Sequence, residues 1–129
     1  MGIEVNNYPR ISKASHVFGE GLEISAILLE FENVHTVFVY QGVPRTGSRV
    51  LVTDDGQSTY TLFAGKHEAE AEALGRVFAR KIGKGISMSV YFEKNFRLPV
   101  DGFGPLIDKL LDAYRAPPKD SGYIDINDK

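Results

Sequence analysis

Residues 22–40, LEISAILLEFENVHTVFVY, decide what kind of fold this chain can form. Ala26–Leu29 is apolar on consecutive residues, and Thr36–Tyr40 is a second run of strand-forming residues. Because the side chains of a strand alternate between its two faces, both strands are predicted to be apolar on both sides. Polar residues between them are typical of a turn. We therefore expect a sheet built around two strands that need cover on each face.

The neighbouring residues predict more strands around this pair. Gly19–Gly21 and the segment Asp54–Gln57 are turn sequences that each separate two strand-like runs, as in β-hairpins. No helical pattern interrupts the first half of the chain, so its strands are expected to form an antiparallel meander or a close relative of one. The five runs are Ile11–Phe18, Leu22–Phe31, Thr36–Tyr40, Arg49–Thr53 and Ser58–Phe63.

Two amphipathic helices and a sixth strand follow in the second half. Apolar residues recur with a helical period in 66–82, which Gly83 is expected to end, and again from Pro105 to Ala116. Between them, Ile86–Phe92 alternates apolar residues with serines. These patterns predict the α+β class: one domain over residues 1–116, with an antiparallel sheet of about six strands and two amphipathic helices. Residues 117–129 are polar and are expected to form a mobile tail.

Composition excludes several classes of protein. The chain has 129 residues and no cysteine, which rules out disulfide scaffolds, cysteine nucleophiles and cysteine-ligated metal sites. Fifteen basic and seventeen acidic residues give a formal net charge of −2, so we expect neither nucleic acid nor an acidic membrane as a partner. The longest apolar runs are far shorter than the roughly 20 residues of a membrane helix. A cytoplasmic protein is expected, with the nucleus as a further compartment.

Residues that often carry catalysis are present but do not form a motif. His16, His35 and His67 have no metal-binding spacing, and we interpret them as separate surface or edge residues. Asp54 and Asp55 precede Gly56, where the hydrogen-bonding preference of aspartate favours a structural role in a turn. We therefore expect a protein that is not an enzyme and that has no catalytic residues, cofactor or metal.

A basic stripe is predicted on the first helix. Arg76, Arg80 and Lys84 follow each other at intervals of four residues, which places them on one exposed side. Such a stripe is most often a solvated face, and an acidic protein partner is the next interpretation.

The two strands that are apolar on both sides give the clearest functional hint. Two helices cover one face of a sheet, so something else must cover the other, and large apolar patches usually mark interaction sites. We expect a dimer interface there, formed by Ile27, Leu29, Val37 and Val39. The opposite phase of the strands would present Ala26, Leu28, Phe38 and Tyr40 instead. Cover by the tail, by the first ten residues or by the loop Val43–Gly47 is the alternative within one chain.

Several segments together resemble the proteasome assembly chaperone 4 family. The likeness covers roughly Leu22–Tyr114 and is most marked at the end of the first helix, Leu74–Lys81, followed by Lys84 and a serine-bearing strand. The other segments that carry it are Thr36–Gly42, Ser58–Phe63, Ile86–Phe92 and the last amphipathic helix.

The resemblance implies a non-enzymatic chaperone for 20S proteasome assembly. Members of that family pair with a second small chaperone, proteasome assembly chaperone 3, and hold an alpha subunit while the alpha ring forms. On this interpretation the chain works as a heterodimer, or as a homodimer when alone, and Arg76, Arg80 and Lys84 contact the alpha subunit.

Two other classes of function stay open. One is a small ligand-binding domain or enzyme with a pocket between sheet and helices, lined by Tyr60, His16 or Tyr91. The other is a homodimeric scaffold protein of trafficking or motor complexes, which rests on fold analogy alone.

Overall fold

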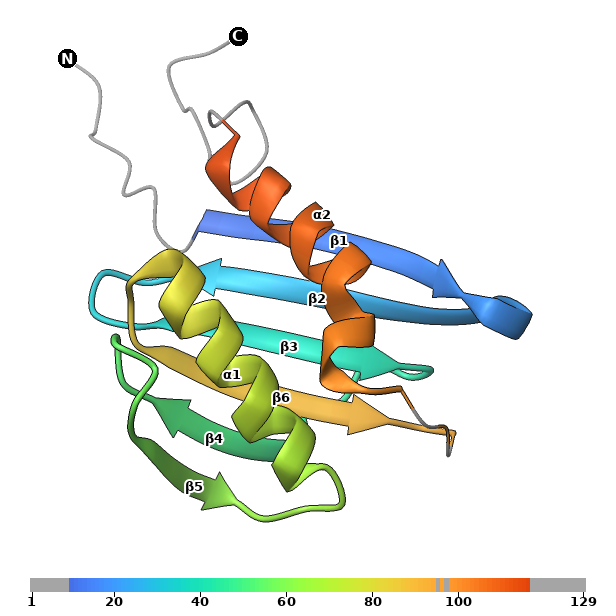
Figure 1. Ribbon diagram of the computed structural model, residues 1–129, viewed down its shortest axis with the longest axis horizontal. Helices are drawn as coiled ribbons and strands as arrows, with labels where there is room; N and C mark the ends of the chain where they lie inside the picture. The colour runs from blue at the N-terminus through green and yellow to red at the C-terminus, as the bar shows by residue number, and fades with distance from the viewer. Residues whose placement is uncertain (1–9, 95, 97, 117–129) are drawn as a thin grey trace, which may run out of the picture.

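The computed structural model describes residues 10–94, 96 and 98–116, which form one six-stranded sheet with two helices in front of it (Figure 1). The expected single α+β domain with six strands and two helices is confirmed for this part of the chain; residues 117–129, the expected tail, lie outside it. The strands are β1 (Arg10–Phe18), β2 (Leu22–Glu30), β3 (His35–Gln41), β4 (Ser48–Val52), β5 (Thr59–Phe63) and β6 (Ile86–Phe92). The helices are α1 (Glu68–Ile82) and α2 (Gly104–Arg115), with short 3-10 turns η1 (Gly19–Gly21) and η2 (Val100–Phe103).

The sheet is mixed, so the expectation of an antiparallel sheet was wrong. Its strand order is β1-β2-β3-β6-β4-β5, and β6 runs parallel to β3 and antiparallel to β4. The loop between β3 and β4 leaves a gap of one strand, and β6 enters that gap after the chain has crossed the sheet as α1. Because the crossover returns the chain in the direction of β3, the pair is parallel.

Both helices pack on one face of the sheet. In Figure 1, α1 lies over β4 and β6 while α2 lies over β1 and β2. A β-carbon on Gly75 would lie 2.7 Å from Val52 Cγ2, so glycine lets α1 approach the sheet closely here. Gly83 ends α1 with φ +78°, and its N–H bonds to the Ala79 carbonyl oxygen at 2.7 Å. The predicted helical stop is thereby confirmed.

The core fills the space between the helices and this face. It contains residues of β2, β3, β4 and β6 with a stripe from each helix, and Phe103 of η2. Its largest fully buried side chains are Phe78, Phe103, Ile24, Leu28, Leu74, Ile86, Met88, Leu106 and Leu110, with Val37, Val50 and Val52.

Candidate functional site

The second face of the sheet carries no helix in the described part of the chain, and we call it the open face. The strand pairing assigns residues to it, since paired residues share a face: Ile27 lies beside Phe38, and Phe38 beside Ser89. Its central strands carry apolar side chains that are only half-buried. The residues that the pairing assigns to the open face are Ile11, Lys13, Ser15, Val17, Glu23, Ser25, Ile27, Leu29, Thr36, Phe38, Tyr40, Arg49, Leu51, Tyr60, Phe63, Ser87, Ser89 and Tyr91.

The structure divides the expected interface residues between the two faces. Ile27 and Leu29 lie on the open face, whereas Val37 and Val39 are 0% and 2% exposed in the core beneath the helices. The four residues expected to form one interface therefore cannot share one surface. Antiparallel pairing sets Ile27 opposite Phe38 and Leu29 opposite Thr36. The apolar residues of β3 that share the open face with Ile27 and Leu29 are therefore Phe38 and Tyr40, not the two valines.

The opposite-phase set is mixed in the same way. Ala26 and Leu28 are buried in the core, while Phe38 and Tyr40 lie on the open face. Alternation within each strand was predicted correctly, but the phase between neighbouring strands depends on which residues pair, and periodicity alone does not supply that register.

Arg49 is an open-face residue that was not predicted from the sequence. Its Nη2 donates a hydrogen bond to Ser87 Oγ at 2.8 Å, and the Gly47 N–H donates to Ser89 Oγ at 3.0 Å. Arg49 Nε is buried and has no hydrogen-bond partner among the described residues. The alternation of Ser48–Val52 was the signal that could have placed Arg49 on the same face as Leu51.

A shallow hollow lies on the open face over β1, β2 and β3. It has a volume of about 300 Å³, and the small side chains of Ser15 and Ser25, which are paired across the two strands, form part of its lining. Ile27 and Tyr40 line it beside them, and Lys13 adds a positive charge. The hollow is the right size for one large side chain of a partner.

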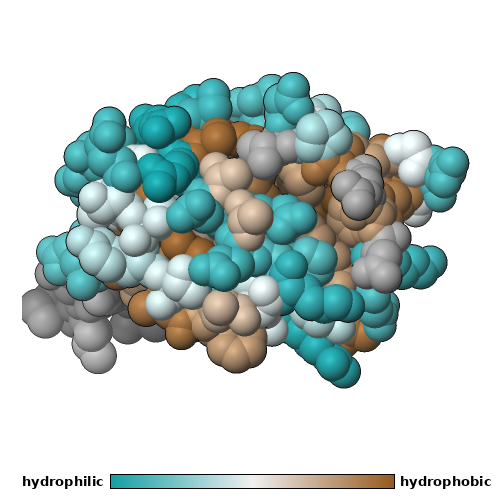
Figure 2. Space-filling view, turned by 60° about the horizontal axis from the view of Figure 1, so that its bottom comes forward, coloured by the Kyte–Doolittle hydropathy of each residue, from teal (hydrophilic) through white to brown (hydrophobic). Residues whose placement is uncertain are grey.

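Strand β5, at the far edge of the sheet, extends the open face with exposed apolar residues. Thr59 and Thr61 donate hydrogen bonds to Glu72 and Glu68 of α1, so the alternate residues Tyr60 and Leu62 point to the open face. These two side chains are 58% and 59% exposed. Figure 2, in which the β5 side comes forward, shows hydrophobic patches separated by hydrophilic side chains.

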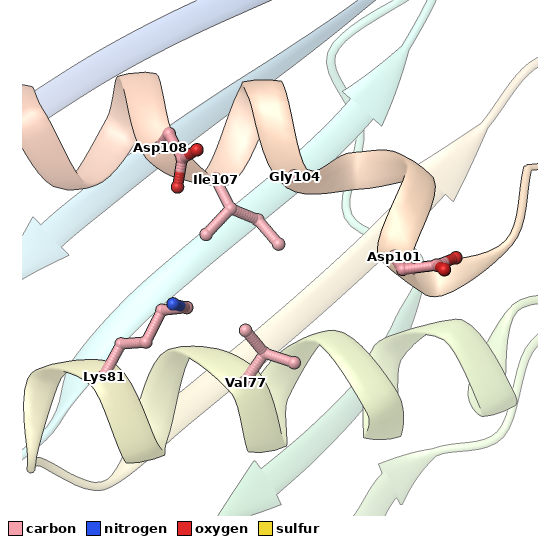
Figure 3. Close-up of a pocket in the computed structure, with 6 residues that line it drawn as sticks. All are labelled: Val77, Lys81, Asp101, Gly104, Ile107 and Asp108. Atoms are coloured by element: carbon pink, nitrogen blue, oxygen red, sulfur yellow. The ribbon is translucent and has the colours of Figure 1, made fainter.

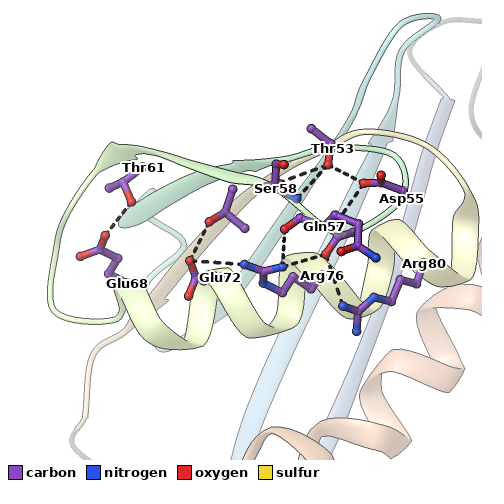
Figure 4. A network of polar contacts seen from close by, with 11 residues as sticks. Thr53, Asp55, Gln57, Ser58, Thr61, Glu68, Glu72, Arg76 and Arg80 are labelled. Carbon is purple, nitrogen blue, oxygen red and sulfur yellow. Dashed lines mark hydrogen bonds and ion pairs between the residues drawn. The ribbon is translucent and has the colours of Figure 1, made fainter.

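The predicted basic stripe is partly used within the fold (Figure 4). Arg76 Nη1 donates hydrogen bonds to the carbonyl oxygens of Gly56 and Gln57, both at 2.8 Å, and so fixes the turn between β4 and β5. Arg80 makes one long hydrogen bond, 3.4 Å, to the Gly56 carbonyl. Lys84 is exposed just beyond the end of α1. Arg80 and Lys84 thus remain available to a partner more fully than Arg76.

Asp54 and Asp55 lie in this same turn, where the sequence analysis placed them. Asp55 Oδ1 accepts hydrogen bonds from Thr53 Oγ1 at 2.7 Å and from the Gln57 N–H at 2.9 Å. The hydrogen bond from Thr53 holds the pKa of Asp55 below its usual value. These contacts are the local ones that favour aspartate in turns.

The residues considered for an enzymatic pocket do not converge. Tyr60 and Tyr91 lie on the open face, but His16 lies on the helix face, where its ring contacts Phe18. The structure therefore does not bring these three side chains into one site. In the described part of the chain, no three His, Cys, Asp or Glu side chains are grouped to hold a metal ion.

His35 is buried, contrary to the expectation of a surface or edge histidine. It is 2% exposed, and its Nε2 lies 3.2 Å from the hydroxyl of Tyr114 on α2. Burial holds the pKa of His35 below its ordinary value of 6.5, although the neighbouring Glu30 carboxylate opposes this shift. Arg10 pairs with Glu30 at 3.5 Å and donates a hydrogen bond to the Tyr114 carbonyl at 3.0 Å. This cluster ties the end of α2 to the sheet.

Neither described helix is long and apolar enough to cross a membrane. The sequence matches no protein-family model and no curated protein.

Proposed function

We propose that the protein is a non-enzymatic chaperone for 20S proteasome assembly, which pairs with a second small chain through the open face and then binds an alpha subunit. The observation that supports this most is the open face, which bears exposed and half-buried apolar side chains and over which no helix of the described residues lies. Large apolar surfaces of this kind usually serve interactions. The proteasome assignment comes from the resemblance of residues 22–114.

The open face is large enough for a stable interface. Six strands span roughly 29 Å, and a strand of seven residues is about 24 Å long, which gives an area of about 700 Å². A standard protein interface takes about 800 Å² from each partner. An interface of about 800 Å² is about a tenth of the 7906 Å² of accessible surface in the structure. One sheet packed on another would use most of the open face.

Charge on the open face favours a partner different from this chain. Lys13 and Arg49 lie among the apolar residues, and Glu23 is the one carboxylate on the described strands of this face. Arg49 is half-buried in the isolated chain, and a partner that covers it takes its guanidinium out of water, which is costly unless the partner supplies an acceptor. A second copy would bring more positive charge, whereas a different chain with carboxylates on its sheet would complement the face.

The alpha subunit is proposed to bind elsewhere, at Arg80 and Lys84. Both are exposed beside the helix face, so they stay accessible when the open face is covered. Arg76 is a weaker candidate because its guanidinium already binds the Gly56 and Gln57 carbonyls.

Purification from the native cell tests this proposal. A tagged chain is isolated at native level, the complex is measured by native mass spectrometry, and its members are identified. We expect one second small chain and one proteasome alpha subunit. A homodimer without an alpha subunit would favour the scaffold class, and a monomer without partners would contradict pairing altogether.

A further inference from the structure

A groove runs between α1 and α2, on the opposite side of the sheet from the open face (Figure 3). Val77 and Ile107 supply its apolar lining, from α1 and α2 respectively. Its volume is about 510 Å³, within the range of about 300–1,000 Å³ that is typical of ligand pockets. The groove exists because the helices lie over different strand pairs and leave a gap between them.

The charged side chains that line the groove form no ion pairs with one another or with other residues in the described part of the chain. Asp101 of η2 and Asp108 of α2 are exposed on one wall, and Lys81 stands on the other. None of these three side chains makes an ion pair or hydrogen bond with another described residue. Among the residues that line the groove, two carboxylates stand against one ammonium, so a cationic group beside an apolar one complements the lining. Arg115, which is not a lining residue, donates a hydrogen bond to the Lys81 carbonyl oxygen at 3.3 Å and adds a positive charge near the ends of the two helices.

Gly104 lines the groove without a side chain, which leaves space on that side. Its φ and ψ, −47° and −49°, are ordinary helical values that any residue adopts. No heavy atom lies within 4 Å of the position that a β-carbon would take. Neither conformation nor packing therefore requires glycine here, although a helical alanine is more stable by up to about 1 kcal/mol. The missing side chain leaves space that a ligand can enter.

We propose that this groove is a docking site for a partner's amphipathic helix, one that inserts leucine-sized side chains between Val77 and Ile107 and presents lysine or arginine to Asp101 and Asp108. Binding of a helix in an apolar groove is a common mode of peptide recognition. The proposal is independent of the proposed function, because the groove and the open face lie on opposite sides of the sheet.

Two synthetic helical peptides test the proposal. Both carry leucines at i, i+3, i+4 and i+7, flanked by arginines in one peptide and by glutamates in the other. Each is titrated into the full ¹⁵N-labelled chain while the amide resonances are followed. We expect the arginine peptide to shift Val77, Gly104 and Ile107 and to bind at least about tenfold more tightly. Equal binding of both peptides, or no shift at these residues, would overturn the proposal.

Matched variants locate the binding to the groove. Gly104→Leu should fill the space and weaken the arginine peptide about tenfold or more without lowering the melting temperature. Gly104→Ala is the control, because one methyl group leaves most of the volume open. Replacing Asp101 and Asp108 together by lysine should reverse the preference between the peptides. Binding that is unchanged in Gly104→Leu, or a preference that is not reversed, counts against the groove.

Discussion

Phe38 and Val39 are neighbours in β3 that point to opposite faces of the sheet, so the same substitution should have opposite consequences at the two positions. Val39 is 2% exposed beneath the helices, whereas Phe38 is half-buried on the open face. We predict that Val39→Asp unfolds the isolated chain, and that Phe38→Asp leaves it folded but abolishes pairing with its partner.

The expected magnitudes differ enough to be separated. Val39→Asp loses about 1.5–3 kcal/mol of valine burial and adds several kcal/mol for an unpaired buried carboxylate. The total, on the order of 5 kcal/mol, approaches the whole stability of a typical domain, about 5–15 kcal/mol. Phe38→Asp costs the isolated chain only about 1–2 kcal/mol in strand propensity and cross-strand contact. At a closed interface, however, its unpaired charge should weaken binding by about a hundredfold or more.

Urea denaturation and light scattering supply the two readouts. The free energy of unfolding is measured for both variants, and the mass of the complex is measured for Phe38→Asp and the native chain. If Phe38→Asp destabilises the isolated chain as strongly as Val39→Asp, the open face is covered within the chain itself. If pairing survives Phe38→Asp, the interface lies elsewhere.

Three further predictions concern the fold. Arg76→Ala should lower the free energy of unfolding by about 1–2 kcal/mol, because two carbonyls of the β4–β5 turn lose a charged donor, while Arg80→Ala should cost less than about 0.5 kcal/mol; equal costs in urea would contradict the roles given to them. Gly75→Ala should destabilise by about 1–3 kcal/mol, since its β-carbon meets Val52 at 2.7 Å, and thermal melting would show no loss if α1 could simply move away. Because the pKa of His35 is lower in the folded chain, the unfolded chain binds more protons, so the contribution of His35 to the free energy of unfolding should be fully present above pH 6.5. It should fall below that pH by up to about 1.4 kcal/mol per pH unit. His35→Gln should flatten this pH dependence, and an unchanged slope would contradict the lowered pKa of His35.

Element positions were predictable from this sequence because the local signals are strong. The glycine turn 19–21, the Asp-Gly turn at Gly56 and the stop at Gly83 each bound an element at a place where the backbone has positive φ. Helical and strand periods then supplied the length and buried side of each element. These signals act over a few residues and do not depend on the tertiary arrangement.

Strand order was not predictable in the same way. The sequence of Ile86–Phe92 does not indicate that this strand pairs with β3 on one side and with β4 on the other. Its neighbours in the sheet depend on where α1 directs the chain. Antiparallel neighbours along the chain are the commonest arrangement, and the meander followed from that tendency. A strand whose residues are nearly all buried is nevertheless typical of the sheet centre, which is where β6 lies.

The sequence predicted that the sheet would have a second apolar face, but not which residues lie on it. The consecutive apolar residues 26–29 predicted a strand that is apolar on both faces, and the two helices were expected to cover one face of the sheet. In the described residues both helices do lie on one face, and Ile27 and Leu29 lie on the other. Which residues share that face required the register between β2 and β3, which pairs Ile27 with Phe38. The role of Arg49 also needs the fold, since Ser87 lies far from it in the sequence and 2.8 Å from it in space.

Photo-crosslinking from Phe38 tests the central claim most directly. Benzoylphenylalanine replaces this residue in the tagged chain, the native cells are irradiated, and the crosslinked species is identified by mass spectrometry. Lys109, exposed on α2, serves as the control position on the helix side. We predict a crosslink from position 38 to one second small chain and none to that chain from position 109. A position 38 that crosslinks to nothing, or only to residues of its own chain, would contradict the claim that the open face binds a partner.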